Sequence, residues 1–539
     1  MRLSLYALFS GLLLAFSWPA TGFFPVVFVA WLPLLFVEDY LRSEQKPNRR
    51  LKLFGYAYLS FIVWNVAATW WVKNASFEGA LLAFLANSLL MTGVFTIASG
   101  LRDRLPGRFA FLYFPVLWTA FEYLHHDWDL SWPWLTLGNA AASMPELVQW
   151  YEYTGTTGGS WWILLVNLFF YKALRKRIEE PGEALLKLIR LPLLLILLPS
   201  LISIIQYLTY AEKADSKVRV AIVQPNIDPY GMKFNAATLD EQLTVFFSLA
   251  RSVCDSSTQW LLGPETALVG SMDEEHLQEF PRIKRIQEFL KDYPKMNILI
   301  GAETHRFYTG NNKPSETARP TRDPDVFFDA YNTALLINRS GIAVYHKSKL
   351  VPGVEQMPFP WLFKHIESLA IDLGGATGTL GKQDDRTVFT STGEAGKVAP
   401  AICYESIYGD FMQEYIRRGA GFIAIITNDG WWGDTPGYKQ HLAFARLRAI
   451  ESRRDVVRAA NTGVSAVINQ RGDILDSRPY WVPASMKAEI SLNESLTVFS
   501  LTGDILGQAA AWMSLFLIVY IRTLLPFSAR SRKPKTTKA

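Results

Sequence analysis

The chain has 539 residues, of which 50% are hydrophobic, 14% aromatic and 19% charged. This length exceeds that of one ordinary domain, and the apolar content excludes an intrinsically disordered protein. The two cysteines, Cys254 and Cys403, are too few for a disulfide-stabilised scaffold. The net charge of +5 is typical of a nucleic-acid-binding protein, but here the basic residues lie in short clusters between apolar runs. That arrangement indicates membrane topology instead.

Residues 1–210 contain seven apolar runs, and an eighth lies at 505–526. A helix needs about 20 apolar residues to cross the hydrocarbon core of a membrane. We therefore predict seven transmembrane helices within 1–210 and one at 505–526, rather than buried helices of a large soluble protein. The first run could alternatively be a cleaved signal peptide, with Ala20 and Gly22 near its end. The runs lie at 3–18, 23–41, 54–72, 78–99, 109–125, 160–176, 190–209 and 505–526.

Lysine and arginine residues are concentrated in alternate connections between these runs. The other connections contain Lys73 and, across 126–159, no lysine or arginine. Because cytoplasmic loops carry the excess of positive charge, we predict that both termini are cytoplasmic, including a basic tail at 527–539. Residues 215–495 would then lie on the opposite side of the membrane. The basic set is Arg42, Lys46, Arg49, Arg50, Lys52, Arg102, Arg104, Arg108, Lys172, Arg175, Lys176, Arg177, Lys187, Arg190, Arg530, Arg532, Lys533, Lys535 and Lys538.

Residues 215–495 alternate short apolar runs with charged, helical segments. This alternation predicts a layered α/β domain in which helices pack on the faces of a sheet. Strands are expected at 217–224, 260–263, 297–302, 331–338, 342–345, 398–402, 422–426 and 457–469, and helices at 274–293 and 437–454.

Cys403 ends one of the predicted strands and is followed by a helical segment. At such a turn, the free N–H groups of the helix N-terminus stabilise a thiolate and a developing oxyanion. The backbone N–H of Tyr404 would be one donor. The alternative is a buried, inert thiol, which is the commonest fate of a free cysteine.

Glu265 ends a second predicted strand, in the segment Leu-Leu-Gly-Pro-Glu-Thr. In open α/β sheets, ligands gather at the carboxyl ends of strands. Desolvation at that place would raise the pKa of the Glu265 carboxyl and suit it to act as a general base toward a thiol. The alternative is an exposed carboxylate at the end of a strand.

Lys347 and Lys349 follow the predicted strand 342–345. Because strand residues two apart face the same side, their spacing does not choose between them. An ammonium group beside a cysteine lowers the pKa of the thiol and can donate to an oxyanion. Alternatively, the two lysines form a solvated basic pair.

Three segments, in the order Glu, Lys, Cys, resemble the signatures of the nitrilase superfamily. They are LGPET around Glu265, YHKSKLVPGVEQMPF at 345–359 and ICYESIYGD at 402–410. The block 428–472 is similar to the C-terminal half of that superfamily. With the predicted spans on both sides of the domain, and SWPWLTLGN at 131–139 in an extracytoplasmic loop, almost the whole chain resembles the bacterial apolipoprotein N-acyltransferase family.

The resemblance implies an αββα sandwich with a catalytic triad of Glu265, Lys347 and Cys403. It selects Lys347 because Lys-x-x-Leu-Val-Pro matches 347–352. Gly353-Val354 precedes the second glutamate where the family commonly has Phe-Gly, and Lys233-Phe234 stands where the family often has a tryptophan after a basic residue. The resemblance also implies supporting or substrate-binding roles for Asn332, Glu355, Tyr404 and Glu405.

The implied chemistry is acyl transfer in two steps. Cys403 takes an acyl chain from a membrane phospholipid as a thioester, and the α-amino group of a diacylglyceryl-cysteine at a lipoprotein N-terminus then attacks it. The nearest alternative is a membrane-anchored nitrilase-type amidohydrolase that uses water as the second nucleophile. A catalytically inactive lipid-binding or transport protein is a third possibility.

The resemblance also implies a monomer in the bacterial inner membrane, with its catalytic domain on the periplasmic side. Its partners would be the phospholipid donor, the apolipoprotein acceptor and membrane lipids, without nucleic acid. The scattered histidines and the lack of a Walker or dinucleotide motif predict neither a metal nor a cofactor. Cys254 is expected to be a separate, structural thiol. The aromatic segments 357–363 and Trp431-Trp432 are expected to form a lipid-facing lid.

Overall fold

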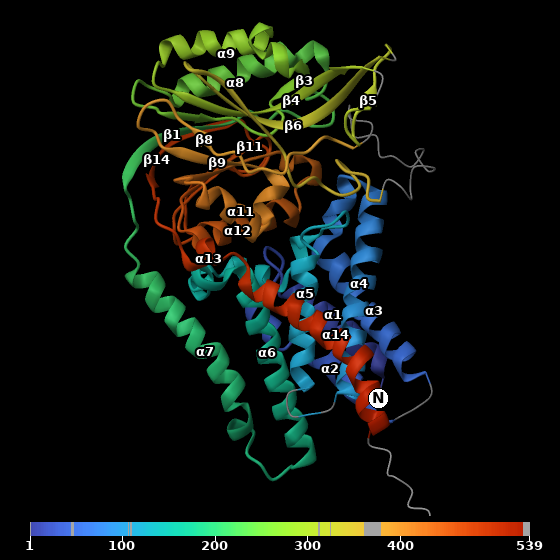
Figure 1. Cartoon of the computed structure of the whole chain (residues 1–539). Helices are drawn as coiled ribbons and strands as arrows, with labels where there is room; N and C mark the ends of the chain where they lie inside the picture. Colours follow the sequence, from blue (N-terminus) through green and yellow to red (C-terminus); the bar gives the residue numbers. More distant parts are fainter. Residues whose placement is uncertain are drawn as a thin grey trace, which may run out of the picture.

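The computed structural model divides the chain into a helical half and an α/β domain that lie end to end (Figure 1). The structure describes residues 2–44, 48–105, 107, 110–310, 313–323, 325–359 and 379–531. The helices of the helical half are α1 (Leu3–Phe16), α2 (Leu32–Ser43), α3 (Arg49–Thr69), α4 (Phe77–Arg104), α5 (Tyr113–Leu124), α6 (Tyr151–Glu179), α7 (Leu185–Thr209) and α14 (Ile505–Ser531).

Several of these helices could cross a membrane, as predicted. By length and composition, five described segments qualify, and the stretches Leu3–Phe16 and Ala110–Leu124 are apolar but shorter. The long helix α6 contains a polar run at 154–160 and is broken at Gly155, where φ is +61°. The number of eight spans therefore stays a prediction. The five segments are Phe24–Ser43, Arg49–Asn74, Phe77–Arg104, Leu185–Thr209 and Ile505–Arg522.

The basic connections lie at the end of the helical half that is farthest from the α/β domain (Figure 1). There, Glu38 of α2 forms ion pairs with Arg42 at 2.7 Å and with Arg102 of α4 at 2.9 Å. Arg49 of α3 pairs with Asp103 of α4. These pairs hold three helices together at one level. The predicted basic residues Lys46, Arg108, Arg532, Lys533, Lys535 and Lys538 lie outside the described residues.

The α/β domain contains two sheets. In both, the central strands run parallel, β1, β2 and β4 in the first and β9, β10 and β11 in the second. The first sheet has the order β14 (Ala484–Leu492), β1 (Ser216–Gln224), β2 (Trp260–Leu262), β4 (Asn297–Thr309), β6 (Val326–Asn338) and β5 (Arg319–Pro320), with β3 (Leu268–Asp273) on β4 and β7 (Gly341–His346) on β6. The second has the order β13 (Ile474–Ser477), β12 (Ala466–Ile468), β11 (Val456–Ala460), β10 (Phe422–Thr427), β9 (Lys397–Ile402) and β8 (Phe389–Thr390).

The alternation of side chains along β1 explains how the layers stack. Val220 and Ile222 belong to the core between the sheets, whereas Ala221 and Val223 pack in the core beneath α8 (Leu239–Val253) and α9 (Pro281–Asp292). On the other side, α11 (Gly409–Arg417) and α12 (Pro436–Ser452) cover the second sheet and face the helical half (Figure 1). The short α13 (Val498–Thr502) leads back into α14. The predicted αββα sandwich is therefore confirmed.

Two predicted elements differ from the structure. The helix expected at 274–293 is a 3₁₀ helix over Glu274–Glu279 followed by α9, because Pro281 lacks an N–H group and favours the first position of a new helix. The strand expected at 457–469 is an antiparallel pair, β11 and β12, because the chain turns at 461–465.

Polar and close contacts join the domain to the helical half. Gln440 of α12 accepts a hydrogen bond from Trp134 Nε1 at 2.7 Å and donates to the carbonyl oxygen of Ala68 at 3.1 Å. Next to it, a Cβ atom on Gly437 would lie 2.6 Å from the Trp71 ring, so glycine permits this close approach. The two halves therefore meet directly beneath α12.

Candidate active site

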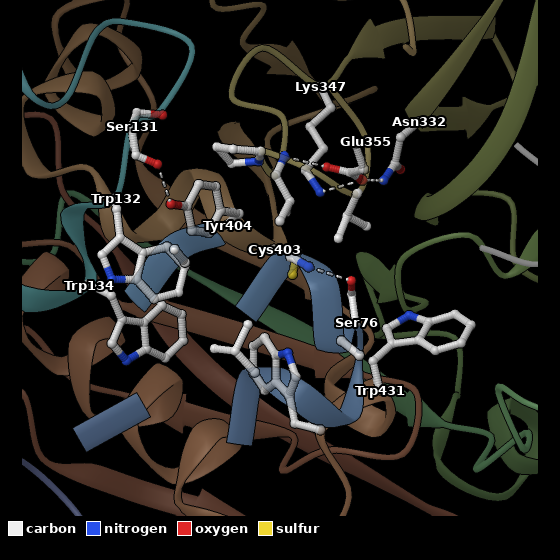
Figure 2. A pocket seen from close by; sticks show the side chains of 18 of the residues that line it. Ser76, Ser131, Trp132, Trp134, Asn332, Lys347, Glu355, Cys403, Tyr404 and Trp431 are labelled. Carbon is white, nitrogen blue, oxygen red and sulfur yellow. Dashed lines mark hydrogen bonds and ion pairs between the residues drawn. The ribbon is translucent and has the colours of Figure 1, made fainter. Parts of the chain in front are cut away.

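The three predicted catalytic residues line one cavity. β2 ends three residues before Glu265, β7 ends directly before Lys347, and β9 ends directly before Cys403. All three side chains line a cavity of about 240 Å³ between the α/β domain and the helical half. Figure 2 shows Lys347, Glu355 and Asn332 grouped on one side of Cys403.

Lys347 lies between two carboxylates. Its side chain is 1% exposed, and its Nζ donates to Glu265 Oε1 at 3.1 Å and to Glu355 Oε1 at 2.9 Å. Asn332 Nδ2 donates to the same two oxygens at 2.7 and 3.0 Å. Burial lowers the pKa of Lys347, but the two carboxylates outweigh it and the net pKa lies well above the usual value. Lys347 is therefore a fixed positive charge.

Glu265 is ionised, contrary to the sequence-based expectation. Burial alone raises the pKa of its carboxyl, but Lys347 and then Lys233 lower it, so the net pKa lies below the usual value. Lys233 Nζ also donates to the Glu265 carbonyl oxygen at 3.0 Å, and the backbone N–H of Asn428 donates to Glu265 Oε2 at 3.1 Å. The expected rise in pKa was wrong because two ammonium groups flank this carboxylate. An ionised Glu265 can accept a proton.

The position of Glu265 depends on a glycine in the neighbouring strand. Gly301 N in β4 donates to the Pro264 carbonyl oxygen at 3.0 Å. A Cβ atom on Gly301 would lie 2.6 Å from Glu265 Cα and 2.5 Å from Thr266 N. Only glycine lets the segment that carries Glu265 lie so close to β4.

Cys403 lies at the predicted strand-to-helix turn, with a strained backbone. Its φ is +50°, which residues with a Cβ rarely adopt, and a 3₁₀ turn over Cys403–Ile407 leads into α11. Burial and the charge of Glu265 raise the pKa of the thiol more than Lys347 lowers it. The expected lowering of the pKa by the ammonium group is present, but burial and Glu265 outweigh it, so the resting thiol keeps its proton.

A buried polar network supports the Cys403 turn, and sequence reasoning did not assign it. Ser406 Oγ donates to the Cys403 carbonyl oxygen at 2.7 Å and lies 2.9 Å from His441 Nε2. His441 Nδ1 lies 3.1 Å from Asp429 Oδ1, and Asp429 pairs with Arg458. His441, Asp429 and Arg458 all come from the block 428–472, so the resemblance was the signal that pointed to this region.

Glu405 joins the cysteine turn to the lysine loop. Its Oε1 accepts from Tyr345 Oη and from Ser348 N, both at 2.6 Å, and its Oε2 accepts from Ile402 N at 2.7 Å. Burial raises the pKa of this carboxyl to about 7, although these hydrogen bonds oppose the rise. Glu405 thus holds the cysteine turn and the lysine loop together from a buried position and is not among the residues that line the cavity.

Lys349 points away from the site. β7 ends at His346, so strand alternation does not continue through the two lysines. Lys349 Nζ pairs with Asp127 Oδ1 at 2.8 Å and donates to the His126 carbonyl oxygen at 3.1 Å, both in the helical half. The structure therefore distinguishes two lysines that spacing left equivalent.

Glu355 reaches the site despite the Gly353-Val354 departure. Its Oε2 accepts a hydrogen bond from Val351 N at 2.9 Å, while its Oε1 contacts Lys347. The two contacts fix the loop 351–355 against Lys347. Asp129 of the helical half then holds the following residues, since it accepts from Gln356 Nε2 and Phe359 N. Of the predicted lid segment 357–363, residues 360–363 lie outside the described residues.

The walls of the cavity are largely apolar and come from both halves of the chain. Tyr404 Oη donates to the Ser131 carbonyl oxygen at 2.9 Å, which places the predicted 131–139 segment at the site (Figure 2). Trp432 packs on Trp71 with ring centroids 4.7 Å apart, and Trp431 stacks on Phe234. Sequence reasoning missed the α4 wall, although its lining residues Gly79, Leu82, Ala86 and Leu90 follow helical spacing.

Cys254 and Cys403 are both free thiols, and Cys254 lies at the end of α8. Within the described part of the chain, no group of three His, Cys, Asp or Glu side chains is arranged to hold a metal ion.

Two family models match the chain. The apolipoprotein N-acyltransferase N-terminal domain matches residues 10–169, and the carbon-nitrogen hydrolase family matches residues 219–495. A protein of Chlorobaculum tepidum is 30% identical over 522 residues, 92% of either chain. A protein of Geobacter metallireducens is 27% identical over 521 residues, which cover 94% of this chain and 92% of that protein. Both relatives are named apolipoprotein N-acyltransferase.

Proposed function

Because the chain belongs to the apolipoprotein N-acyltransferase family, we propose that Cys403 carries an acyl group between two lipid substrates. The protein is an acyltransferase of the nitrilase superfamily that N-acylates lipoproteins, as the sequence predicted. The catalytic roles of Glu265, Lys347 and Cys403 are our proposal. It is supported by their shared cavity and by the charge states of Glu265 and Lys347.

In the first step, ionised Glu265 takes the proton from Cys403 Sγ. The thiolate attacks the carbonyl carbon of the sn-1 ester of a phospholipid, so that a C–S bond forms. Lys347 Nζ and the backbone N–H of Tyr404 stabilise the oxyanion. The ester C–O bond then breaks, and Glu265 gives the proton to the oxygen of the departing lysophospholipid.

In the second step, the α-amino group of the acceptor's diacylglyceryl-cysteine attacks the thioester. Glu265 takes a proton from the nitrogen as the amide bond forms and returns it to Sγ as the C–S bond breaks. Asn332 and Glu355 hold Glu265 and Lys347 in place through both steps. Glu265 and Lys347 act in both steps, which is consistent with the many contacts that fix their positions.

The apolar cavity wall is the observation that favours acyl transfer over amide hydrolysis. Gly79, Leu82, Ala86 and Leu90 form a stripe down α4, beside the cavity that holds Cys403. An alkyl chain that lies along this stripe avoids the cost of about 0.8 kcal/mol for each CH₂ group exposed to water. The aromatic walls also keep water from a thioester, whereas a membrane-anchored amidohydrolase would admit it.

We also propose that the α/β domain lies on the periplasmic side of a bacterial inner membrane, with eight spans and both termini cytoplasmic. The basic connections at the far end of the helical half support this orientation. The close packing of α1 against α3 supports the proposal that α1 is retained as a span. A Cβ atom on Gly11 of α1 would lie 2.3 Å from the Ser60 carbonyl oxygen of α3. The expected monomer fits a site that this chain forms alone.

The product of the reaction tests the proposal. The purified protein in detergent micelles is given a phospholipid with an isotopically labelled sn-1 chain and a diacylated lipopeptide with a free α-amino group. We expect mass spectrometry to show one labelled chain on the lipopeptide with the wild type and with Cys254→Ala, but not with Cys403→Ala. Labelled free fatty acid without acylated lipopeptide would contradict acyl transfer and support the hydrolase.

A further inference from the structure

Glu303 is a carboxylate in the wall of the active-site cavity that has no part in the two steps above. It lies on β4 directly opposite Asn332 of β6. Residues opposite one another in an antiparallel pair project from the same face, with Cβ atoms about 5 Å apart. Glu303 is therefore the cross-strand neighbour of Asn332, the residue that donates to Glu265 and Glu355.

Glu303 differs from those two carboxylates in having no ion pair within the described residues. Glu265 and Glu355 share the Lys347 ammonium, whereas Glu303 accepts one hydrogen bond, from Gly270 N to its Oε2 at 3.3 Å. The charges of Arg282, which lies near Gly270, and of Arg319 act on Glu303, but neither forms an ion pair with it within the described residues. The Oε1 atom of Glu303 is therefore available to a ligand.

The charges that line the cavity favour a positively charged ligand. Three carboxylates, Glu265, Glu303 and Glu355, face the cavity together with the Lys347 ammonium, and the Lys233 ammonium lies behind Glu265, so the carboxylates exceed the ammonium groups by one. A cavity with a net negative lining and low-dielectric walls attracts cations. Since Glu265 and Glu355 are already bonded to Lys347, Glu303 is the carboxylate that can bind a further cation.

We propose that Glu303 is the subsite that binds the ammonium group of the acceptor's N-terminal cysteine when it enters the acylated site. This inference rests on the function proposed above, in which the second substrate is an amine. A carboxylate that accepts a charge-assisted hydrogen bond from the ammonium group would hold the nitrogen near Glu265 and the thioester. Glu303 then takes the proton that the ammonium group must lose before the neutral amine attacks, and passes it to solvent.

A primary ammonium group could also come from the donor, if the phospholipid has an ethanolamine headgroup. The two sources share one chemistry but act in different steps, so the half-reactions separate them. Phosphatidylglycerol has no ammonium group and phosphatidylethanolamine has one. A donor role for Glu303 would affect thioester formation, whereas an acceptor role affects only transfer.

The test uses full-length Glu303→Gln in micelles, because glutamine keeps an oxygen for Gly270 N and removes only the charge. Glu241→Gln, at an exposed position on α8, is the matched control. Intact mass follows thioester formation on Cys403 with each donor, and rapid mixing with a diacylated lipopeptide follows transfer. We expect unchanged thioester formation and an about tenfold higher lipopeptide concentration at half-maximal transfer, the size expected of one lost charge-assisted hydrogen bond.

A salt titration adds a measurement on the wild type, which does not depend on how the variant folds. If an ion pair binds the acceptor, added salt raises the half-saturating lipopeptide concentration of the wild type. The same salt should raise this concentration much less in Glu303→Gln. An unchanged half-saturating concentration in Glu303→Gln would overturn the inference. So would slower thioester formation, whether with phosphatidylethanolamine alone, which would assign Glu303 to the donor, or with both donors, which would assign it a structural role. A wild type that forms no thioester would instead contradict the proposed function.

Discussion

Replacing Lys347 with methionine should abolish acyl transfer and destabilise the α/β domain, whereas Lys349→Met should do neither. The Lys347 ammonium is buried between Glu265 and Glu355, at 3.1 and 2.9 Å. Removing one partner of a buried ion pair costs about 3–5 kcal/mol, because it leaves an uncompensated buried charge. Lys349 pairs with Asp127, whose side chain is 91% exposed, and such a surface pair contributes about 0–1 kcal/mol.

The loss of activity follows from the protonation of Glu265. Burial raises the pKa of its carboxyl, and Lys347 is the larger of the two charges that reverse this rise. Without Lys347, the repulsion between Glu265 and Glu355 adds to the burial, so one of the two carboxyls takes up a proton. A protonated Glu265 cannot accept the Cys403 proton. The double variant Lys347→Met/Glu355→Gln should regain stability, since one buried carboxylate is gone, but not activity.

Thermal unfolding of the purified protein in one detergent at pH 7.5 measures stability, and intact mass after incubation with phospholipid measures thioester formation. Lys349→Met is the matched control, two residues away and of the same chemistry. A free energy of unfolding for Lys347→Met within about 1 kcal/mol of the wild type, the range of a surface pair, would contradict the buried ion pair. Thioester formation by that variant at the wild-type rate would contradict the role of Lys347 in keeping Glu265 ionised.

Two further predictions concern Glu265 and Glu405. Gly301→Ala should lower the transfer rate about 100-fold, because the new Cβ atom displaces Glu265. Gly182→Ala is the control and should keep the wild-type rate, because a Cβ atom there has no neighbour within 4 Å. Equal transfer rates for the two variants would contradict this prediction. Burial raises the pKa of Glu405 from 4.5 to about 7, so its contribution to stability is greatest below pH 4.5 and is lost as the pH rises through 7. Glu405→Gln should therefore gain about 3 kcal/mol relative to the wild type between pH 4.5 and 8 in unfolding measurements. A difference independent of pH would disprove the assignment.

The candidate site could be predicted where local sequence determines it. Glu265 and Cys403 each follow an apolar strand, and the carboxyl ends of strands meet at one edge of a sandwich. The apolar runs likewise predicted a helical half. These predictions depend on hydrophobic periodicity and on short motifs, which are properties of neighbouring residues.

Other features depend on packing between distant segments, which one sequence does not reveal. The pKa of Glu265 is lowered because Lys347 and Lys233, from different loops, both lie beside it. Spacing could not separate Lys347 from Lys349, because the end of β7 at His346 decides their directions.

The cavity wall and the third carboxylate are equally long-range features. Glu303 lies inside β4 without any motif, and only the register with Asn332 brings it to the site. The α4 wall comes from a segment that lies more than 160 residues before Glu265 in the chain.

The mass of the intact protein purified from bacterial membranes, with and without neutral hydroxylamine, tests whether Cys403 carries the acyl chain. We predict a fraction of the protein that is heavier by one fatty acyl chain, located on Cys403 by peptide mapping and removed by hydroxylamine. Cys254→Ala should retain this adduct and Cys403→Ala should lack it. An acyl chain on another residue, or phospholipid turnover without any adduct on Cys403, would contradict the thioester mechanism.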